Sequence, residues 1–148
     1  MRRAGTLLAL TLLAAPAMAQ DDAFAQAMDA ALAPAGETAP FLRCTGLFQA
    51  FRALAGSDTE VGATAFEREL DMAVLSTILR QQETGAEETA VMDEIRPLIE
   101  AAAALYLDRF VANEAATGEV LDEGLTGTLA VCSELRQQFL DATEAPAE

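Results

Sequence analysis

The sequence predicts an all-α fold: an up-and-down helical bundle of four main helices plus a short N-terminal helix, stapled by one disulfide bond. Alanine, the strongest helix former, is very frequent, and β-branched residues are sparse. Apolar residues recur at spacings of three and four, and glycines and prolines fall mainly between these periodic segments. The only two cysteines of the chain, Cys44 and Cys132, each lie on the apolar face of a predicted helix.

The first residues have the layout of a cleavable secretory signal peptide, predicted over residues 1–19. Arg2 and Arg3 make the start positive, residues 7–15 are almost entirely apolar, and small residues precede a cut after Ala19. The apolar run is shorter than the roughly 20 residues that a membrane-spanning helix needs. We therefore expect cleavage near Ala19 and export to the periplasm, or secretion.

The mature chain has the length of one ordinary domain, predicted as a helical domain over residues 20–142 with a disordered tail over residues 143–148. Charged residues interrupt every later apolar run, so we predict no transmembrane segment in the mature chain. The formal net charge is −15, and every basic residue is an arginine. Such acidity disfavours nucleic acids and anionic membranes as partners, because both are negatively charged.

The first two predicted helices cover residues 22–33 and 40–55. Pro34 and Gly36 end the first helix, and Thr38 is the predicted N-cap of the second. The apolar faces hold Phe24, Met28 and Leu32 in the first helix, and Phe41, Cys44, Leu47, Phe48, Phe51 and Leu54 in the second. We therefore expect Cys44 to point into the bundle.

The third and fourth helices are predicted over residues 57–82 and 85–113. Each is preceded by the capping-box pattern, a serine or threonine three residues before a glutamate, at Ser57 and at Thr84. The predicted core positions are Phe66, Leu70, Val74 and Ile78 in the third helix, and Met92, Ile95, Ile99, Ala102, Tyr106 and Phe110 in the fourth.

The last helix is predicted over residues 120–142, with an apolar face made of Leu125, Leu129, Cys132, Leu135 and Phe139. In an exported protein an even number of cysteines favours a disulfide, and two cysteines allow only the pairing of Cys44 with Cys132. Short connections make successive helices antiparallel neighbours, so the second and fifth helices can close the bundle side by side. The predicted topology and the predicted disulfide therefore support each other.

The residue types that are missing exclude most kinds of enzyme. Without histidine there is no Ser–His or Cys–His pair and no histidine-bearing zinc site. Without lysine there is neither a Walker A loop nor Schiff-base chemistry. We therefore predict no catalytic, cofactor-binding or metal-binding residues and expect a protein that is not an enzyme.

Carboxylates are the remaining acid–base groups, and a glycan-acting enzyme could use two of them across a cleft. The closest pairs are Glu67 with Asp71, Asp93 with Glu94, and Asp122 with Glu123. Glycan clefts are usually lined with aromatic rings, but this chain has seven phenylalanines and one tyrosine, nearly all at core-type spacing. We interpret the acidic pairs as solvated helix faces and the arginines as their ion-pair partners, which leaves a glycan-acting enzyme as a distant third hypothesis.

The leading functional hypothesis is a non-enzymatic interaction module, an adaptor, inhibitor or chaperone-like protein that binds another exported protein. It predicts an apolar patch on the surface. The aromatic positions Phe41, Phe48 and Phe51 are most simply core residues, but they could also form an apolar groove. The alternative is a carrier that holds an apolar small molecule within the bundle, which predicts an internal cavity lined by phenylalanine and leucine.

Overall fold

The computed structural model describes residues 15–144, which form five α-helices and one short 3₁₀ segment. Their bounds are α1 Ala15–Leu32, η1 Ala33–Thr38, α2 Ala39–Ala55, α3 Glu60–Thr84, α4 Glu88–Thr117 and α5 Glu123–Glu144. No strand occurs among these described residues, and Cys44 is bonded to Cys132. The predicted all-α bundle and its disulfide are therefore confirmed.

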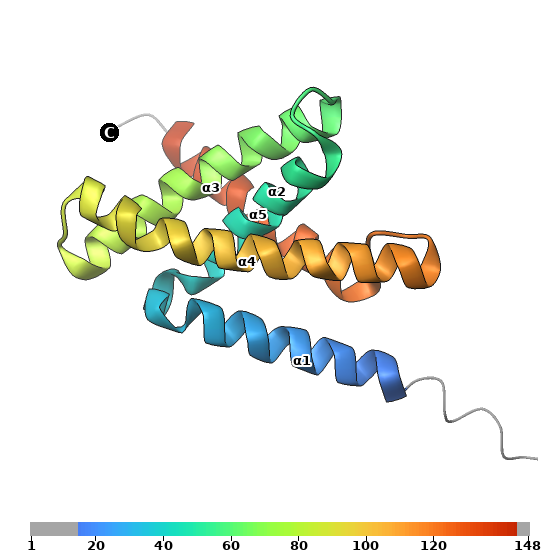
Figure 1. Cartoon of the computed structure of the whole chain (residues 1–148). Coiled ribbons are helices and arrows are strands. Elements are labelled where there is room, and N and C mark those ends of the chain that lie inside the picture. The colour runs from blue at the N-terminus through green and yellow to red at the C-terminus, as the bar shows by residue number, and fades with distance from the viewer. Residues whose placement is uncertain (1–14, 145–148) are drawn as a thin grey trace, which may run out of the picture.

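The central element of the bundle is α2, which contacts α1, α3, α4 and α5. In Figure 1, α4 crosses in front of α2, and α1 lies alongside α4. Between residues 42 and 50 of α2, only Arg43 and Gln49 are partly exposed. The sequence predicted a single apolar face for this helix, but its other sides are buried too, including Leu42 and Ala50. A helix in this position must be apolar nearly all round.

The N-terminal helix packs its predicted face on the core. Met28 and Leu32 are buried, and the ring of Phe24 lies 5.4 Å from the ring of Tyr106. The helix begins at Ala15 and is longer than predicted, since it runs through the predicted cleavage site. Residues 1–14, which hold most of the predicted signal peptide, lie outside the described part of the chain.

The turn between α2 and α3 places the helix cap later than predicted. Gly56 ends α2 with φ of 85°, and α3 begins at Glu60. The cap is Thr59, whose hydroxyl accepts the backbone N–H of Gly62 at 2.9 Å, so the predicted cap at Ser57 is wrong. A β-carbon on Gly62 would lie 1.9 Å from the carbonyl oxygen of Gly56. This close approach requires a glycine in the first turn of α3.

Two other predicted caps are also wrong. Thr38 has helical backbone angles, and its hydroxyl donates to the carboxylate of Glu83 at 3.0 Å and does not cap α2. Thr84 is the last residue of α3, because Gly85 adopts the left-handed conformation that ends a helix. The capping box predicted at Thr84 therefore does not form, and α4 starts at Glu88.

The last helix starts and ends later than predicted. Asp122 precedes its first turn and accepts the backbone N–H of Leu125 at 2.8 Å. Its end at Glu144 lies inside the tail predicted over residues 143–148, of which residues 145–148 lie outside the described part.

The core face of α3 differs from the prediction. Its predicted core positions are exposed at the surface: Phe66 by 44%, Leu70 by 49%, Val74 by 51% and Ile78 by 40%. The face that α3 buries consists of Gly62, Ala65, Met72 and Ser76. Small side chains on this face let α3 lie close to the central helix α2, and the larger apolar residues therefore point outward.

The faces predicted for α4 and α5 are largely confirmed. In α4, Ile95, Ala102, Tyr106 and Phe110 are buried, whereas Met92 is 42% exposed and does not belong to the core. In α5 only Leu125 and Cys132 are fully buried, and the other predicted positions, Leu129, Leu135 and Phe139, are half-buried.

Candidate functional site

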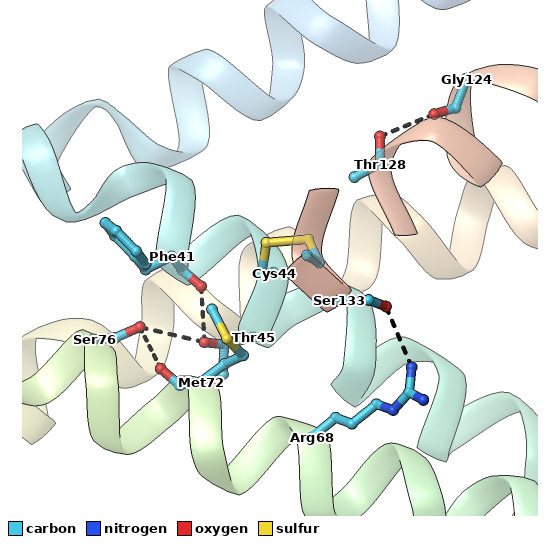
Figure 2. The surroundings of a disulfide bond; sticks show 10 residues. Phe41, Cys44, Thr45, Arg68, Met72, Ser76, Gly124, Thr128 and Ser133 are labelled. Carbon is cyan, nitrogen blue, oxygen red and sulfur yellow. Dashed lines mark hydrogen bonds between the residues drawn. A yellow bond between two sulfur atoms is a disulfide. The ribbon is translucent and has the colours of Figure 1, made fainter. Parts of the chain in front are cut away.

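The disulfide joins the central helix to the last helix (Figure 2). The α-carbons of Cys44 and Cys132 lie 5.3 Å apart, within the usual range for a bonded pair, and both side chains are buried. Besides the disulfide, α5 is attached by the ion pair of Arg136 with Asp71 of α3 and by a hydrogen bond from Arg68 to Ser133. Because α5 buries few residues, the covalent link is a main attachment of this helix.

Polar side chains at the contact of α2 with α3 satisfy one another locally. Figure 2 shows Thr45 donating to the carbonyl of Phe41 at 2.9 Å and Ser76 donating to the carbonyl of Met72 at 2.7 Å. The two hydroxyl oxygens lie 3.4 Å apart. Each hydroxyl therefore donates its proton within its own helix, and the two groups meet at the contact between α2 and α3.

The three phenylalanines of the predicted groove are not brought together. Phe48 is buried and, with the half-buried Phe51, lines a hollow of about 310 Å³ beside α3 and Leu129 of α5. Phe41 lies at a different hollow, near η1 and the end of α3. The ring of Phe51 packs 4.9 Å from that of Phe110 in the core. Two of these three residues therefore share one surface hollow and the third does not.

A hollow larger than the two above lies beside the disulfide. It has a volume of about 680 Å³ and is bordered by α1, η1, α2 and α5. Its lining is mostly apolar and includes Leu32, Val131 and Leu135, while the ion pair of Arg43 with Asp29 provides the charged groups.

The most distinctive surface is the outward side of α3, which we call the α3 face and define as Phe66, Leu70, Val74 and Ile78. These residues repeat every four positions, so they form a continuous ridge about 18 Å long at 1.5 Å per residue. Toward α4, the ridge is continued by Ala73 and Thr77, which share a hollow of about 210 Å³ with Met92. On the other side lies Asp71, which is bonded to Arg136 of α5.

The arginines of the described residues are almost all neutralised by carboxylates. Six of the seven form ion pairs: Arg43 with Asp29, Arg52 with Glu69, Arg80 with Glu83 and Glu94, Arg96 with Asp93, Arg109 with Asp21 and Asp122, and Arg136 with Asp71. The seventh, Arg68, lies over the ring of Phe48. This confirms the interpretation of the arginines as ion-pair partners, and it leaves the remaining charge of the surface negative.

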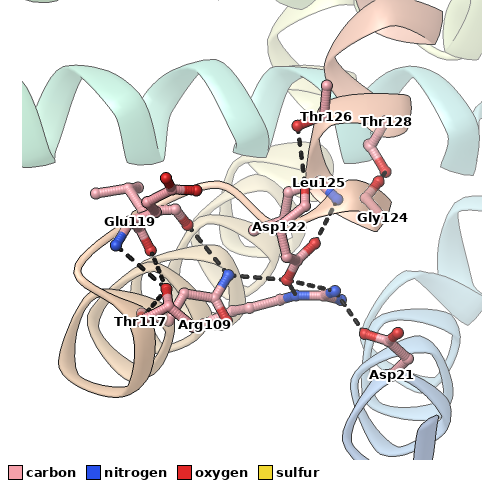
Figure 3. A network of polar contacts seen from close by, with 11 residues as sticks. Asp21, Arg109, Thr117, Glu119, Asp122, Gly124, Leu125, Thr126 and Thr128 are labelled. Carbon is pink, nitrogen blue, oxygen red and sulfur yellow. Dashed lines mark hydrogen bonds and ion pairs between the residues drawn. The ribbon is translucent and has the colours of Figure 1, made fainter. Parts of the chain in front are cut away.

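Arg109 links three elements (Figure 3). Its guanidinium bonds Asp122 before α5 at 2.7 Å and Asp21 of α1 at 2.6 Å, and it lies 4.6 Å from the centre of the Phe24 ring. Asn113 donates to the same Asp122 carboxylate at 2.8 Å. In the predicted acidic pair, Asp122 therefore belongs to this hydrogen-bond network, whereas Glu123 is exposed.

Two carboxylates of the described residues have lowered pKa values because of their hydrogen bonds. Burial would raise the pKa of Asp122, but hydrogen bonds from Leu125, Asn113 and Arg109 outweigh it and lower that pKa. Hydrogen bonds from Arg80 likewise lower the pKa of Glu83. The described residues contain no group of three or more metal-ligating side chains.

Comparisons with models of protein families, with curated proteins and with solved structures found no match to this chain. Within the described residues, no helix combines the length and the apolar character needed to cross a membrane.

Proposed function

We propose that this protein is an exported, non-enzymatic interaction module that binds another exported protein through the α3 face. One observation carries the proposal: four large apolar side chains at regular spacing are exposed on a well-formed helix. Isolated exposed apolar residues are ordinary, but a continuous row of them marks an interaction site. The energy gained when a partner covers such residues, about 25 cal/mol per Å² of apolar surface, is the usual source of affinity.

Export is supported by two features. The N-terminal residues match the signal-peptide layout, and the two cysteines are bonded as in oxidising compartments. A cut after Ala19 would keep Asp21 and Phe24, through which α1 contacts Arg109. N-terminal sequencing of the protein expressed with its own leader is expected to start at Gln20, and an intact N-terminus would contradict the export proposal.

Binding through the α3 face can be tested with a matched pair of variants. Val74 of α3 is 51% exposed and Val111 of α4 is 58% exposed, so Val74→Ser and Val111→Ser remove the same side chain from surfaces of similar exposure. We expect Val74→Ser, and more strongly Leu70→Ser with Val74→Ser, to reduce recovery of a specific exported partner. Val111→Ser should behave as the wild-type protein.

The outcome depends on the fold being unchanged, which circular dichroism of each variant checks. Equal recovery of the partner by the Leu70→Ser/Val74→Ser and Val111→Ser variants would contradict the assignment of the α3 face.

The hollow beside the disulfide supports a second candidate, a carrier of an apolar small molecule. Its volume of about 680 Å³ lies within the range of about 300–1,000 Å³ that small-molecule sites have. Val131→Trp would fill it from α5. If this hollow binds apolar small molecules, an apolar fluorophore should saturate the wild-type protein. Val131→Trp should remove that binding, whereas Leu70→Ser/Val74→Ser should preserve it. The reverse pattern would assign the dye to the α3 face and contradict the carrier.

A further inference from the structure

We infer that the partner presents a cationic amphipathic helix to the α3 face, with apolar residues along one side and lysine or arginine beside them. This inference rests on the proposed function and adds the chemical class of the partner. It follows from three properties of the surface: the shape of the apolar ridge, the carboxylates on its two edges, and the pairing of the arginines.

The shape of the ridge favours a helical partner. Phe66, Leu70, Val74 and Ile78 lie one helical turn apart, and Met92 of α4 stands beside the hollow next to them. Side chains spaced by three and four on a second helix would fit between residues with this repeat, as ridges pack into grooves in helix pairs. The length of about 18 Å corresponds to three to four turns of such a helix.

Carboxylates border the ridge on both edges. Toward α5, Glu67 lies one turn before Asp71, is exposed, and has no ion-pair partner among the described residues. Toward α4, Glu100 lines the same hollow as Ala73 and Thr77, and it too is exposed and without an ion pair within the described chain. A bound helix would therefore have an unpaired carboxylate on each side of its apolar face. The guanidinium of Arg96 lines the same hollow as Glu100, but it lies 3.9 Å from the carboxylate of Asp93.

The spacing of four residues would allow Arg96 to pair with the carboxylate of Glu100. In the structure Arg96 instead lies 3.9 Å from Asp93. Glu100 is therefore available to a partner.

The overall charge argues against a second copy of this chain as the occupant. Each copy has a formal net charge of −15, and removal of a leader with Arg2 and Arg3 would make it more negative. Two α3 faces placed against each other would bring Glu67 and Glu100 of both copies close together. Like charges in contact cost energy, whereas a basic helix gains from the same carboxylates and from faster association.

Three synthetic peptides distinguish these possibilities when titrated into the purified protein. One is a basic amphipathic helix with leucines on one face and lysines and arginines beside them. The second keeps the leucines but replaces the basic residues by glutamate, and the third is a scrambled form of the first. We expect the basic amphipathic peptide to bind at least about tenfold more tightly than either of the others.

Two double variants of the protein separate the apolar and the charged contributions to peptide binding. Leu70→Ser/Val74→Ser should abolish the preference for the amphipathic over the scrambled peptide. Glu67→Gln/Glu100→Gln should weaken binding several-fold and reduce its loss between about 50 and about 200 mM salt. The matched control is Glu114→Gln/Glu119→Gln, which removes two exposed, unpaired carboxylates elsewhere on the described surface and should change binding little.

The results of these binding measurements test the cationic partner and the α3 face separately. Equal binding of the acidic and basic amphipathic peptides would overturn the cationic partner while leaving the α3 face as the interaction site. Equal binding of the scrambled peptide, or no effect of Leu70→Ser/Val74→Ser, would overturn the proposed function as well. A dimer in sedimentation equilibrium that Leu70→Ser/Val74→Ser converts to monomer would show that a second copy covers this face and would overturn the inference.

Discussion

Gly46 of α2 faces Ala102 of α4 so closely that a β-carbon at position 46 would lie 2.7 Å from the β-carbon of Ala102. The same atom would lie 3.0 Å from the backbone nitrogen of Ala103. Real β-carbons do not approach other atoms at the first of these distances. The alanine-rich part of α4 is therefore the contact surface for the central helix.

Gly46→Ala is expected to destabilise the protein, by about 1–3 kcal/mol, because the added methyl group forces two packed backbones apart. This is opposite to the usual effect in a helix, where replacing glycine by alanine gains up to about 1 kcal/mol. Gly127 of α5 is the matched control, since a β-carbon there would meet nothing within 4 Å. Denaturant unfolding should show a loss for Gly46→Ala and a gain for Gly127→Ala, and a gain for both would contradict the close contact.

Loss of the disulfide should act first on α5. Cys44→Ala/Cys132→Ala opens a cross-link with a sequence separation of 88, worth about 4–5 kcal/mol in the loop-entropy model. Because α5 buries fully only Leu125 and Cys132, its amides are expected to exchange with solvent faster, while those of α2 stay the most protected. Hydrogen exchange measures this, and the reduced wild-type protein should give the same pattern. Unchanged protection of α5 would mean that its non-covalent contacts suffice.

Tyr106 is the only tyrosine, so its ionisation can be followed by absorbance. Burial raises the pKa of Tyr106 to about 12, although the charges of Arg43 and Arg109 oppose this. In the unfolded chain the pKa is about 10. The folded state therefore favours the neutral phenol, and the stability that this gives is complete below pH ~10 and is lost as the pH rises toward 12.

The matched variant for this titration is Tyr106→Phe. It should remove the alkaline loss of stability. At neutral pH it should cost little, because the Tyr106 hydroxyl is buried without a hydrogen-bond partner in the described part of the protein. Ionisation near pH 10 in the folded protein, or a large loss of stability in Tyr106→Phe, would contradict the burial of this hydroxyl.

Asp122 should contribute to acid unfolding. Its pKa is lowered in the folded state, since the bonds from Leu125, Asn113 and Arg109 outweigh the effect of burial. Its stabilising effect is therefore present above the unfolded pKa of about 3.9 and is lost as the pH falls through the lower folded value. Asp122→Asn should lower the free energy of unfolding at neutral pH. It should also make the free energy of unfolding depend less on pH in acid. Glu123→Gln, at the neighbouring exposed carboxylate, should have little effect, and similar effects of both variants would contradict this role.

The local periodicity of the sequence predicted the helices, and the count of two cysteines predicted the pairing of Cys44 with Cys132. Periodicity did not identify the buried side of every helix. In α4 the largest apolar residues do face the core, as Tyr106 and Phe110 show. In α3 the same reasoning selected the exposed residues, including Phe66 and Leu70. The signal that could have identified the buried face was its small residues, Gly62, Ala65 and Ser76, which allow two helices to lie close together.

Phe41, Phe48 and Phe51 show why helical spacing could not predict which residues share a surface hollow. Their spacing places them on one side of α2, but a helix at the centre of a bundle has several neighbours. Phe48 and Phe51 consequently lie toward α3 and α5, and Phe41 lies toward η1 and the end of α3. Periodicity reports the side of a helix on which a residue lies, and the neighbour that covers it depends on the packing of the whole chain.

The sequence by itself determined the helical class, the approximate extent of each helix, the single disulfide pairing and the strongly negative charge, because composition, spacing and residue counts specify these locally. Only the tertiary structure decided that α2 is the central helix, that Gly46 meets Ala102, and that the α3 face is exposed. The physical reason is that burial is a property of pairs of surfaces: helices approach most closely where both carry small side chains, and a larger apolar row can thereby be left at the surface.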